Sequence, residues 1–465
     1  MKTGRLLDAT VTLVTILTFL LTSTFLCFPE FASIQDSGVL KYEVKNIFVG
    51  ELKHTIQITN PTNNRIAGKL VVPLVKNDTA RHYAILCNIT AIGSAFNERL
   101  FLNDSSGNVY VCWDGIILQP RGTFIVELEY YVLAFSINYL VNSSLVEGYD
   151  TNSELYLKYT QPEKLIESDN KKIVEVARNI TNGESDPHKM ALLIYSFVTK
   201  HLKYEIQDAE MGALWALENG VGDCSEHSYL FVALCRAVGI PARIQAGFAF
   251  HHVGEVIEDG HMWAEYYLEN YGWIPVDATW QLFDSIDYTH LSSIQSIPEA
   301  TPYANYVFNN TVGMQPKDKQ NVRFKPISPT EFSDNQFAEK IVTAVQKTRQ
   351  AELGVFLGKI FGTNLIFSSE TQRLVQEILE SKIHIQNAAN CWEESPKIAQ
   401  SNVAYALERA ERALKDAWML IVKTFALYMG IPLALVLISL IFLRNRFRKK
   451  LFEDVGTSNI ASMFM

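Results

Sequence analysis

The fold is decided by residues 220–248, which read GVGDCSEHSYLFVALCRAVGIPARIQAGF. Asp223 is followed three residues later by Glu226, which matches a capping box and predicts that a helix begins here. An apolar stripe with helical spacing follows, made of Phe231, Leu234, Cys235 and Val238. Gly239 and Pro241 then predict the end of the helix.

Cys224 lies in the first turn of this predicted helix. The unpaired backbone N–H groups and the helix dipole favour the thiolate at that place, and the thiolate is the nucleophilic form. The same N–H groups can receive the oxyanion that forms when sulfur attacks a carbonyl. An inert buried thiol is the commonest alternative for a cysteine, and we expect it for Cys235, about three turns further along the stripe.

A second stretch, residues 261–280, reads HMWAEYYLENYGWIPVDATW and predicts a β-hairpin. Alternation places His261 and Trp263 on one face of the first strand. With a three-residue loop at 269–271, Asp277 opposes Trp263 and is diagonal to His261, about 7–8 Å away between backbones. A hydrogen bond between the two side chains would let Asp277 fix the tautomer and orientation of His261.

Together the two stretches resemble the transglutaminase-like superfamily. Its typical pattern is a G-x-C turn, a helix ending in GIPAR, an H-x-W-x-E strand and a W-x-x-x-D strand. The resemblance covers about residues 150–295 and implies a papain-like α+β fold with thiol chemistry on amides. In this catalytic triad, the resemblance makes Cys224 the nucleophile, His261 the acid and base, and Asp277 the orienting residue.

The resemblance also raises the question of which groups form the oxyanion hole. Related thiol enzymes use an additional side chain that precedes the cysteine, and the candidates here are Trp215 and Asn219. Trp263, beside His261, is a further candidate for the cleft. Core packing is the alternative for Trp215, which lies on an apparent helix. Without these side chains, backbone N–H groups alone must stabilise the oxyanion.

Composition argues against nucleic-acid binding, and the histidine spacing argues against a metal site. The 41 Lys and Arg residues against 50 Asp and Glu give a formal net charge of -9, so no nucleic-acid partner is expected. His251, His252, Glu255 and His261 are close in sequence, but their spacing fits no regular zinc pattern. We therefore expect neither a metal ion nor another cofactor.

Two apolar runs predict anchoring in a lipid bilayer. Residues 9–28 indicate a transmembrane helix or signal anchor, with a removed signal peptide as the alternative. Residues 424–443 form a second run, followed by a basic tail at 444–465. Because basic flanks stay inside, both termini, including residues 1–8, are expected in the cytoplasm, and about 30–420 outside.

The predicted outer segment carries six N-x-[ST] sequons, each of them a weak signal for glycosylation. Their asparagines are Asn77, Asn88, Asn103, Asn142, Asn179 and Asn309. Cys87 and Cys112 lie in a β-rich part of this segment and are the candidate disulfide for an oxidising exterior.

The flanking regions show different patterns. Residues 38–136 contain short alternating runs separated by turn residues, which predict a β-sandwich-like domain. No catalytic cluster occurs in it, so we expect a spacer or a binding module. Residues 296–335 are rich in Pro, Asn, Thr and Ser and predict a linker. Residues 336–417 predict a helical region or stalk that leads to the membrane.

The sequence thus predicts a membrane-anchored extracytoplasmic thiol enzyme, either a cysteine protease or amidase or a transglutaminase-type acyltransferase. It would attack a peptide or protein amide through a thioester on Cys224 and pass the acyl group to water or an amine. The alternative is a catalytically silent transglutaminase-like scaffold or interaction protein at the membrane surface. The complete triad favours the enzyme, and solvent exposure of Cys224 distinguishes the two.

Overall fold

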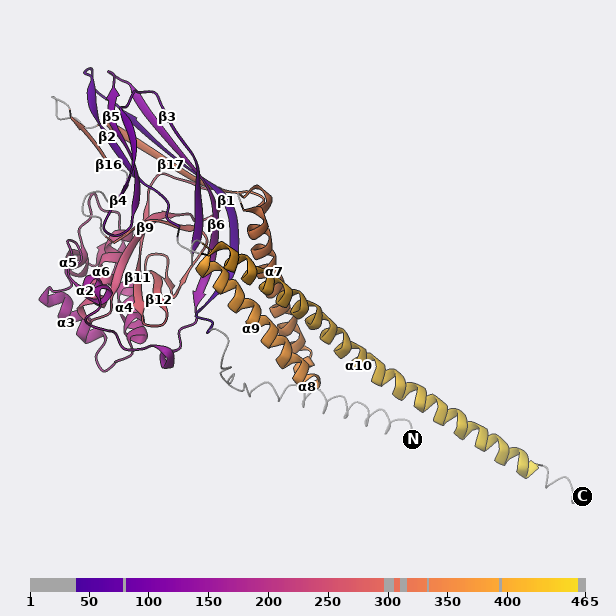
Figure 1. Cartoon of the computed structure of the whole chain (residues 1–465). Helices are drawn as coiled ribbons and strands as arrows, with labels where there is room; N and C mark the ends of the chain where they lie inside the picture. The colour runs from indigo at the N-terminus through magenta and orange to yellow at the C-terminus, as the bar shows by residue number, and fades with distance from the viewer. Residues whose placement is uncertain are drawn as a thin grey trace, which may run out of the picture. The chain divides into compact units, whose positions relative to one another are not determined.

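The computed structural model describes residues 39–77, 81–296, 305–309, 316–332, 334–392 and 395–458 (Figure 1). The apolar run predicted to be a membrane helix at 9–28 lies outside these residues. From Leu40 onward, the described residues belong to one compact unit of mixed α and β structure.

A two-layer β module occupies the N-terminal part of this unit. Its larger sheet has the order β10-β17-β1-β6-β14, with β3 also paired to β6. These strands are β1 (Tyr42–Thr59), β3 (His82–Ile92), β6 (Thr123–Tyr139), β10 (Val256–Ile257), β14 (Ser285–Ile286) and β17 (Lys317–Pro326). The smaller sheet, in the order β16-β2-β5-β4, comprises β2 (Ile66–Pro73), β4 (Glu98–Asn103), β5 (Val109–Leu118) and β16 (Asn305–Asn309).

Alternation of apolar residues explains why these segments form strands with one buried face. Leu52 and Ile56 on β1 and Phe124 and Val126 on β6 are buried in the same cluster as Trp113 of the smaller sheet. The β-rich domain predicted for residues 38–136 therefore exists as a pair of packed sheets, and it also recruits strands from later in the chain.

The predicted linker at 296–335 is wrong for residues 305–309, which form β16, and for residues 317–326, which form β17. This strand pairs with β1 along ten residues, from Gly50 opposite Pro326 to Thr59 opposite Lys317. Its polar composition hid the pattern, because only Val322 and Phe324 of the strand are fully buried. β17 returns to β1 across more than 250 residues of chain, a distance that local sequence signals do not report.

The part of the chain for which the sequence predicts a papain-like fold, here called the papain-like part, contains a third sheet covered by helices. Its strands run in the order β13-β12-β11-β9-β15. They are β9 (Ala242–Ala249), β11 (His261–Leu268), β12 (Gly272–Asp277), β13 (Leu282–Phe283) and β15 (His290–Gln295). The helices are α2 (Glu154–Thr160), α3 (Lys171–Ile180), α4 (Pro187–His201), α5 (Ala213–Asn219) and α6 (Cys224–Ala237). Short elements complete this part: η1 (Ser143–Leu145), β7 (Lys203–Tyr204) and β8 (Val221–Gly222).

Local signals place two of these helices. α4 begins after Asp186, whose side chain accepts a hydrogen bond from the backbone of His188, and Pro187 occupies the first helical position. α6 is buried along almost its whole length and packs against β11 and β9. Because α6 is buried on nearly all sides, including its polar residues Glu226 and Arg236, it is the central helix of this part.

The β module and the papain-like sheet share a core. Phe248 of β9, Phe250 just beyond it and Leu291 of β15 are buried in the apolar cluster of the β module. A buried ion-pair network joins the two parts as well. Glu265 of β11 pairs with Arg81, which precedes β3, and accepts hydrogen bonds from Arg243 at 2.6 Å and Gln245 at 2.8 Å.

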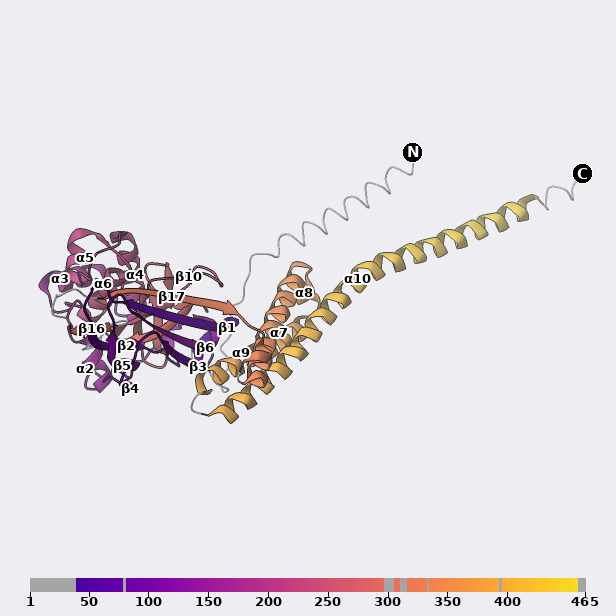
Figure 2. The same ribbon diagram turned by 90° about the horizontal axis from the view of Figure 1, so that it is seen from above.

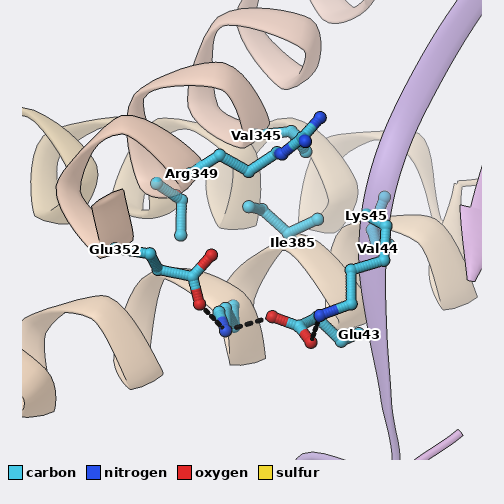
Figure 3. A pocket seen from close by; sticks show the side chains of 9 residues that line it. Glu43, Val44, Lys45, Val345, Arg349, Glu352 and Ile385 are labelled. Carbon is cyan, nitrogen blue, oxygen red and sulfur yellow. Dashed lines mark hydrogen bonds and ion pairs between the residues drawn. The ribbon is translucent and has the colours of Figure 1, made fainter. Parts of the chain in front are cut away.

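The helical region packs against β1 of the larger sheet. It consists of η2 (Pro329–Glu331), α7 (Asn335–Ile360), α8 (Thr363–Ile366), α9 (Ser368–Cys391) and α10 (Pro396–Ser458). A small cavity of about 240 Å³ lies between α7, α9 and β1. Figure 3 shows the side chains that line it. Lys382 of α9 forms ion pairs there with Glu43 of β1 and Glu352 of α7. The predicted stalk is helical, and it is tied to the sheet by these charges.

α10 is a continuous helix of 63 residues that contains the apolar run predicted at 424–443 (Figure 2). Within the part of the chain that the structure describes, it is the one helix long and apolar enough to cross a membrane, judged by length and composition. A break separates it from α9, which ends at Cys391, because α10 begins at Pro396.

Replacing Glu265 should destabilise the fold strongly. The variant Glu265→Gln leaves Arg81 and Arg243 buried without their carboxylate, and removing one partner of a buried ion pair costs about 3–5 kcal/mol. A urea titration of the detergent-solubilised chain, followed by tryptophan fluorescence, measures the loss. The matched control is Glu127→Gln, which removes the partner of Lys53 in a pair of half-exposed side chains and should cost less than about 1 kcal/mol. Equal effects of the two variants would contradict this role of Glu265.

Candidate active site

The nucleophile candidate stands at the start of α6, as predicted. The side chain of Asp223 caps the helix by accepting a hydrogen bond from Ser225 N at 2.9 Å, and Glu226 closes the capping box on Asp223 N at 3.1 Å. Cys224 is the first helical residue and is half-buried. Its sulfur therefore lies at the positive end of the helix dipole without being sealed in the core.

Cys235 has the opposite surroundings. It is fully buried in the main apolar core, and burial raises the pKa of its thiol well above the usual value. Since the thiolate is the reactive form, this cysteine is an inert core residue, which confirms the prediction.

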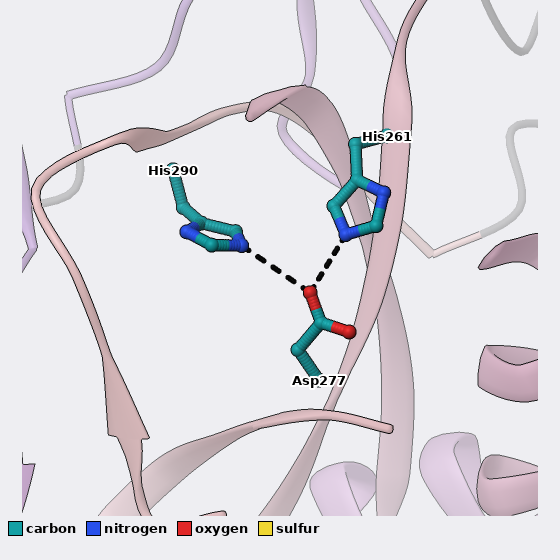
Figure 4. A group of neighbouring side chains, drawn as sticks. All are labelled: His261, Asp277 and His290. Carbon is teal, nitrogen blue, oxygen red and sulfur yellow. Dashed lines mark hydrogen bonds and ion pairs between the residues drawn. The ribbon is translucent and has the colours of Figure 1, made fainter. Parts of the chain in front are cut away.

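The hairpin that carries the other two residues has the predicted register. Leu268 pairs with Gly272 and Ala264 with Val276, so the loop is 269–271 and Trp263 lies opposite Asp277. His261 is diagonal to Asp277, and its Nε2 lies 2.6 Å from Asp277 Oδ2 (Figure 4). The structure thus brings His261 and Asp277 into the hydrogen bond that the alternation predicted.

Asp277 is a fully buried carboxylate with all of its acceptor positions engaged. Its Oδ1 accepts hydrogen bonds from the backbone N–H groups of Thr279 and Trp280, both at 2.9 Å. Its Oδ2 faces two imidazoles, those of His261 and His290. Burial alone would raise the pKa of the Asp277 carboxyl, but the two histidines hold it well below its usual range. The group therefore remains a carboxylate.

His290 is a member of this constellation that sequence reasoning missed. Its ring lies between two carboxylates, with Nε2 3.2 Å from Asp277 Oδ2 and Nδ1 2.8 Å from Asp287 Oδ1. Both nitrogens face acceptors, so both must donate, which requires the charged imidazolium. Burial alone would lower the pKa of His290, but these hydrogen bonds raise it to about 9. The one local sequence signal for His290 was Asp287, an acidic residue three positions earlier. The contact between His290 and Asp277 depends on the pairing of β15 with β9, which the local sequence does not indicate.

His261 connects the carboxylate to the thiol. Burial alone would lower the pKa of its imidazole, but hydrogen bonds to Asp277 and to Cys224 raise it to about 9. Because Nε2 is bonded to Asp277, Nδ1 is the nitrogen available to the sulfur of Cys224. The arrangement can transfer a proton between thiol and imidazole while the buried carboxylate stabilises the imidazolium.

Two histidines and a carboxylate meet at this place, and these residue types are also metal ligands. The ligand atoms of His261, Asp277 and His290 lie within 4.8 Å of one another. However, His261 Nε2 and Asp277 Oδ2 are only 2.6 Å apart, whereas two ligands of one tetrahedral zinc ion stand about 3.3 Å apart. The spacing is that of a hydrogen bond, so the cluster fits a proton-transfer system better than a metal site.

A cleft of about 360 Å³ opens at Cys224 and His261. One wall comes from the β module, through His54, Pro73 and Gln320. His54 Nε2 lies 3.0 Å from Gln320 Oε1, and burial lowers the pKa of His54 to about 4, so this wall presents a neutral imidazole. The β module thus contributes to the site, which a simple spacer would not do.

None of the three predicted cleft candidates lines the cleft. Trp215 and Asn219 are on α5, where the Asn219 side chain donates to the Trp215 carbonyl oxygen at 2.8 Å, and neither lines the cleft. Their helix turns them away, since α5 ends at Gly220 before the chain reaches Cys224. Gln207, in the segment before α5, lines the cleft and is the amide side chain closest to the expected role. Sequence reasoning missed it because the segment around it is polar and lacks a helical or strand pattern.

Trp263 lies behind His261 on β11 and is almost completely buried. The two rings are stacked with their centroids 6.1 Å apart, and Trp263 also meets the His290 ring edge-on at 5.3 Å. Trp263 thus packs against both imidazoles and fixes their positions, without lining the cleft itself.

The predicted disulfide between Cys87 and Cys112 is wrong. Both are free thiols, because Cys87 is exposed on β3 of the larger sheet whereas Cys112 is buried on β5 of the smaller sheet. Among the predicted glycosylation positions, Asn309 has a side chain outside the described residues. The other five asparagines are exposed, and their modification stays a prediction: Asn77, Asn88, Asn103, Asn142 and Asn179.

The two histidines should make stability fall at alkaline pH. Their folded pKa of about 9 exceeds the ordinary value of 6.5, so their contribution is fully present below pH 6.5 and is lost as pH rises through about 9. In His290→Gln, the melting temperature should be lower near pH 6 and should fall less between pH 6.5 and 9 than in the parent chain. The exposed His252→Gln is the control, and a pH profile of His290→Gln parallel to that of the parent would contradict the charged state of His290.

Comparison with known proteins agrees with this site. Residues 174–278 match the family model described as transglutaminase-like superfamily. An uncharacterized protein of Haemophilus influenzae is 31% identical over 132 residues, which are 23% of this chain and 35% of that protein. The chain therefore matches only about a third of the length of this curated relative.

Two solved structures are similar to the chain at low sequence identity. One is a candidate cysteine protease from Cytophaga hutchinsonii, with a TM-score of 0.44, 16% identity, and coverage of 61% of this chain and 100% of that one. The other is the periplasmic domain of TgpA from Pseudomonas aeruginosa, bound to ethylmercury, with a TM-score of 0.27, 16% identity, and coverage of 50% and 91%. The family match spans α6 and the β11–β12 hairpin, and the chain thus contains a domain of the transglutaminase-like superfamily.

Proposed function

We propose that the chain is a membrane-anchored, extracytoplasmic thiol enzyme that attacks peptide or side-chain amides through a thioester on Cys224. The observation that carries this proposal is that Cys224 and His261 line one cleft, while the buried Asp277 behind them is hydrogen-bonded to His261. A half-exposed thiol at a helix start, hydrogen-bonded to an oriented imidazole, has the features of an activated nucleophile. A silent scaffold has no need of a half-exposed thiol in an open cleft.

The reaction follows from the positions of the three groups. The sulfur of Cys224 attacks the amide carbonyl carbon while His261 holds the proton that the thiol has given up. The C–N bond then breaks, His261 gives this proton to the leaving amine, and a thioester remains on Cys224. Water or an amine next attacks the thioester, loses its proton to His261, and releases an acid or a new amide together with the free thiol.

The oxyanion that forms in both steps needs donors in the cleft. The N–H groups of Ser225 and His227 donate to Asp223 within the helix cap. The N–H of Cys224 is therefore the main-chain candidate, and Gln207 is the side-chain candidate. Gln207 Nε2 donates to the Glu205 carbonyl oxygen at 3.0 Å, so a change of rotamer would bring it to the substrate.

Membrane anchoring is the second part of the proposal. It is supported by the apolar, exposed face of α10 over residues 435–443 and by the basic residues that follow. In the proposed orientation both termini are cytoplasmic and residues of about 30–420, with the cleft, face the outside. The substrate is then a peptide or protein outside the cytoplasm.

Labelling by a thiol-directed electrophile tests the nucleophile. The full chain in detergent should react rapidly with an iodoacetamide probe near pH 7, and Cys224→Ala should remove this rapid phase. His261→Ala should slow labelling of Cys224 by about 10²-fold or more, because the imidazole no longer activates the thiol. Mass spectrometry of the labelled peptide identifies the modified residue.

Cys87→Ala is the matched control, because Cys87 is the exposed free thiol among the described cysteines. This variant should keep the rapid phase. Labelling that survives in Cys224→Ala and disappears in Cys87→Ala would contradict the assignment. Rapid labelling without turnover of any peptide or amine in a substrate library would instead favour the scaffold function.

A further inference from the structure

The tip of the helical region exposes a group of large apolar side chains. This apolar tip comprises the end of α7, the turn after it and α8. Its members are Leu353, Phe356, Ile360, Phe361, Leu365 and Ile366, each between 37% and 61% exposed. Such a concentration of exposed apolar side chains marks a surface that contacts a partner or a membrane.

The apolar tip and the neighbouring part of α10 both contain very few charged residues. Residues 353–369 contain one charged residue, Lys359, and residues 417–443 contain one, Lys423. Next to both segments, Arg373 of α9 forms an ion pair with Asp416 of α10 at 3.2 Å. Beyond this ion pair, both segments present apolar surface with single lysines, whose long side chains can extend toward lipid phosphates.

Direct contacts place the tip alongside the start of the apolar run of α10. Gly354 packs against Ala417, leaving no room for a β-carbon on the glycine. Thr363 Oγ1 lies 2.8 Å from Thr424 Oγ1. The Tyr428 hydroxyl donates to the Phe361 carbonyl oxygen at 2.8 Å. The tip therefore follows α10 from residue 417 to residue 428.

The length of the apolar run shows where this segment would lie in a bilayer. The 27 residues of 417–443 extend about 40 Å at 1.5 Å per residue, whereas the hydrocarbon core is about 30 Å thick. Residues 424–443 alone fill that thickness, which leaves 417–423 in the headgroup region. The level of Thr424, which α8 contacts, is then the boundary of the hydrocarbon.

Aromatic residues gather at this boundary. Phe361 of the tip meets Phe425 with ring centroids 4.8 Å apart, and Trp418 and Tyr428 are about half exposed on α10. Tryptophan and tyrosine are enriched at the interface between membrane and water, where the ring is apolar and the polar atom stays hydrated. This composition favours a lipid surface over a protein partner.

We propose that the apolar tip inserts into the interfacial region of the leaflet through which α10 enters the membrane. This inference rests on the proposed anchoring by α10 and adds a second attachment to it. The helical region would then contact lipid through two elements that are joined by side-chain contacts. Because α7 and α9 also pack on β1, the second attachment would limit the rotation of the whole described unit about α10.

Photolabelling from the lipid side tests the proposal on the full chain. The protein is reconstituted into phosphatidylcholine and phosphatidylglycerol vesicles that contain a lipid with a diazirine in its acyl chain. After illumination, mass spectrometry should find lipid adducts in peptides from 353–366 as well as from 424–443. The internal control is β4, where Phe101 is 55% exposed, close to the 59% of Phe356, and should carry no adduct.

The possible results separate the inference from the anchoring. Adducts at 424–443 without adducts at 353–366 would overturn the inference and leave the anchor intact. Absence of adducts from both segments would overturn the anchoring too. Protein cross-links from the tip to residues 9–28 or to a second copy, without lipid adducts, would overturn the inference in favour of that occupant.

A variant with three exposed tip residues replaced provides a second test. The combination Leu353→Ser, Phe356→Ser and Leu365→Ser should reduce adducts at the tip at least fivefold and leave those at 424–443 unchanged. The matched control is Leu100→Ser with Phe101→Ser on β4, which should change neither. Probe labelling of Cys224 reports that each variant is folded, and unchanged adducts at the tip of the triple variant would count against the proposal.

Discussion

The buried carboxylate of Asp277 is the group on which the site depends. It lies at the end of β12, accepts two backbone hydrogen bonds and faces two imidazoles, so it orients His261 without contacting the sulfur. A buried charge of this kind is stable only with all its partners in place. His290 is one of these partners and is itself balanced by Asp287. Behind the thiol, a chain of alternating charges thus runs from His261 through Asp277 and His290 to Asp287.

Glu265 is a second buried carboxylate, and it stabilises the fold by pairing with side chains from separate parts of the chain, as Asp277 does in the site. It stands on β11, four residues after His261, and its carboxylate gathers Arg81 from the β module and Arg243 from β9. The β module is thereby held against the sheet that carries His261. Since His54 and Gln320 come from that module, the shape of the cleft depends on this buried network as much as on the papain-like part.

Features that depend on residues close together in the sequence could be predicted from the sequence, whereas features that depend on contacts between distant segments could not. The capping box at Asp223 and the register that joins His261 to Asp277 follow from residues within 17 positions of each other. β17 forms a strand by pairing with β1, more than 250 residues earlier, and His290 reaches Asp277 because β15 pairs with β9. Neither pairing is visible in the local sequence. Trp215 and Asn219 were reasonable by residue type, but neither lines the cleft, whereas Gln207, from the segment before α5, does.

In the proposed reaction, the walls of the cleft would also determine what can follow thioester formation. The side chain of His261 is only 11% exposed, so a nucleophile can reach the imidazole only through the cleft that the leaving amine vacates. If the rest of the substrate fills this space, water is excluded, and an amine held by the cleft is favoured; if the space stays open, water reacts first. In the proposed reaction, the wall formed by His54, Pro73 and Gln320 would therefore influence the choice between hydrolysis and transfer, although it belongs to the β module and lies outside the family motif.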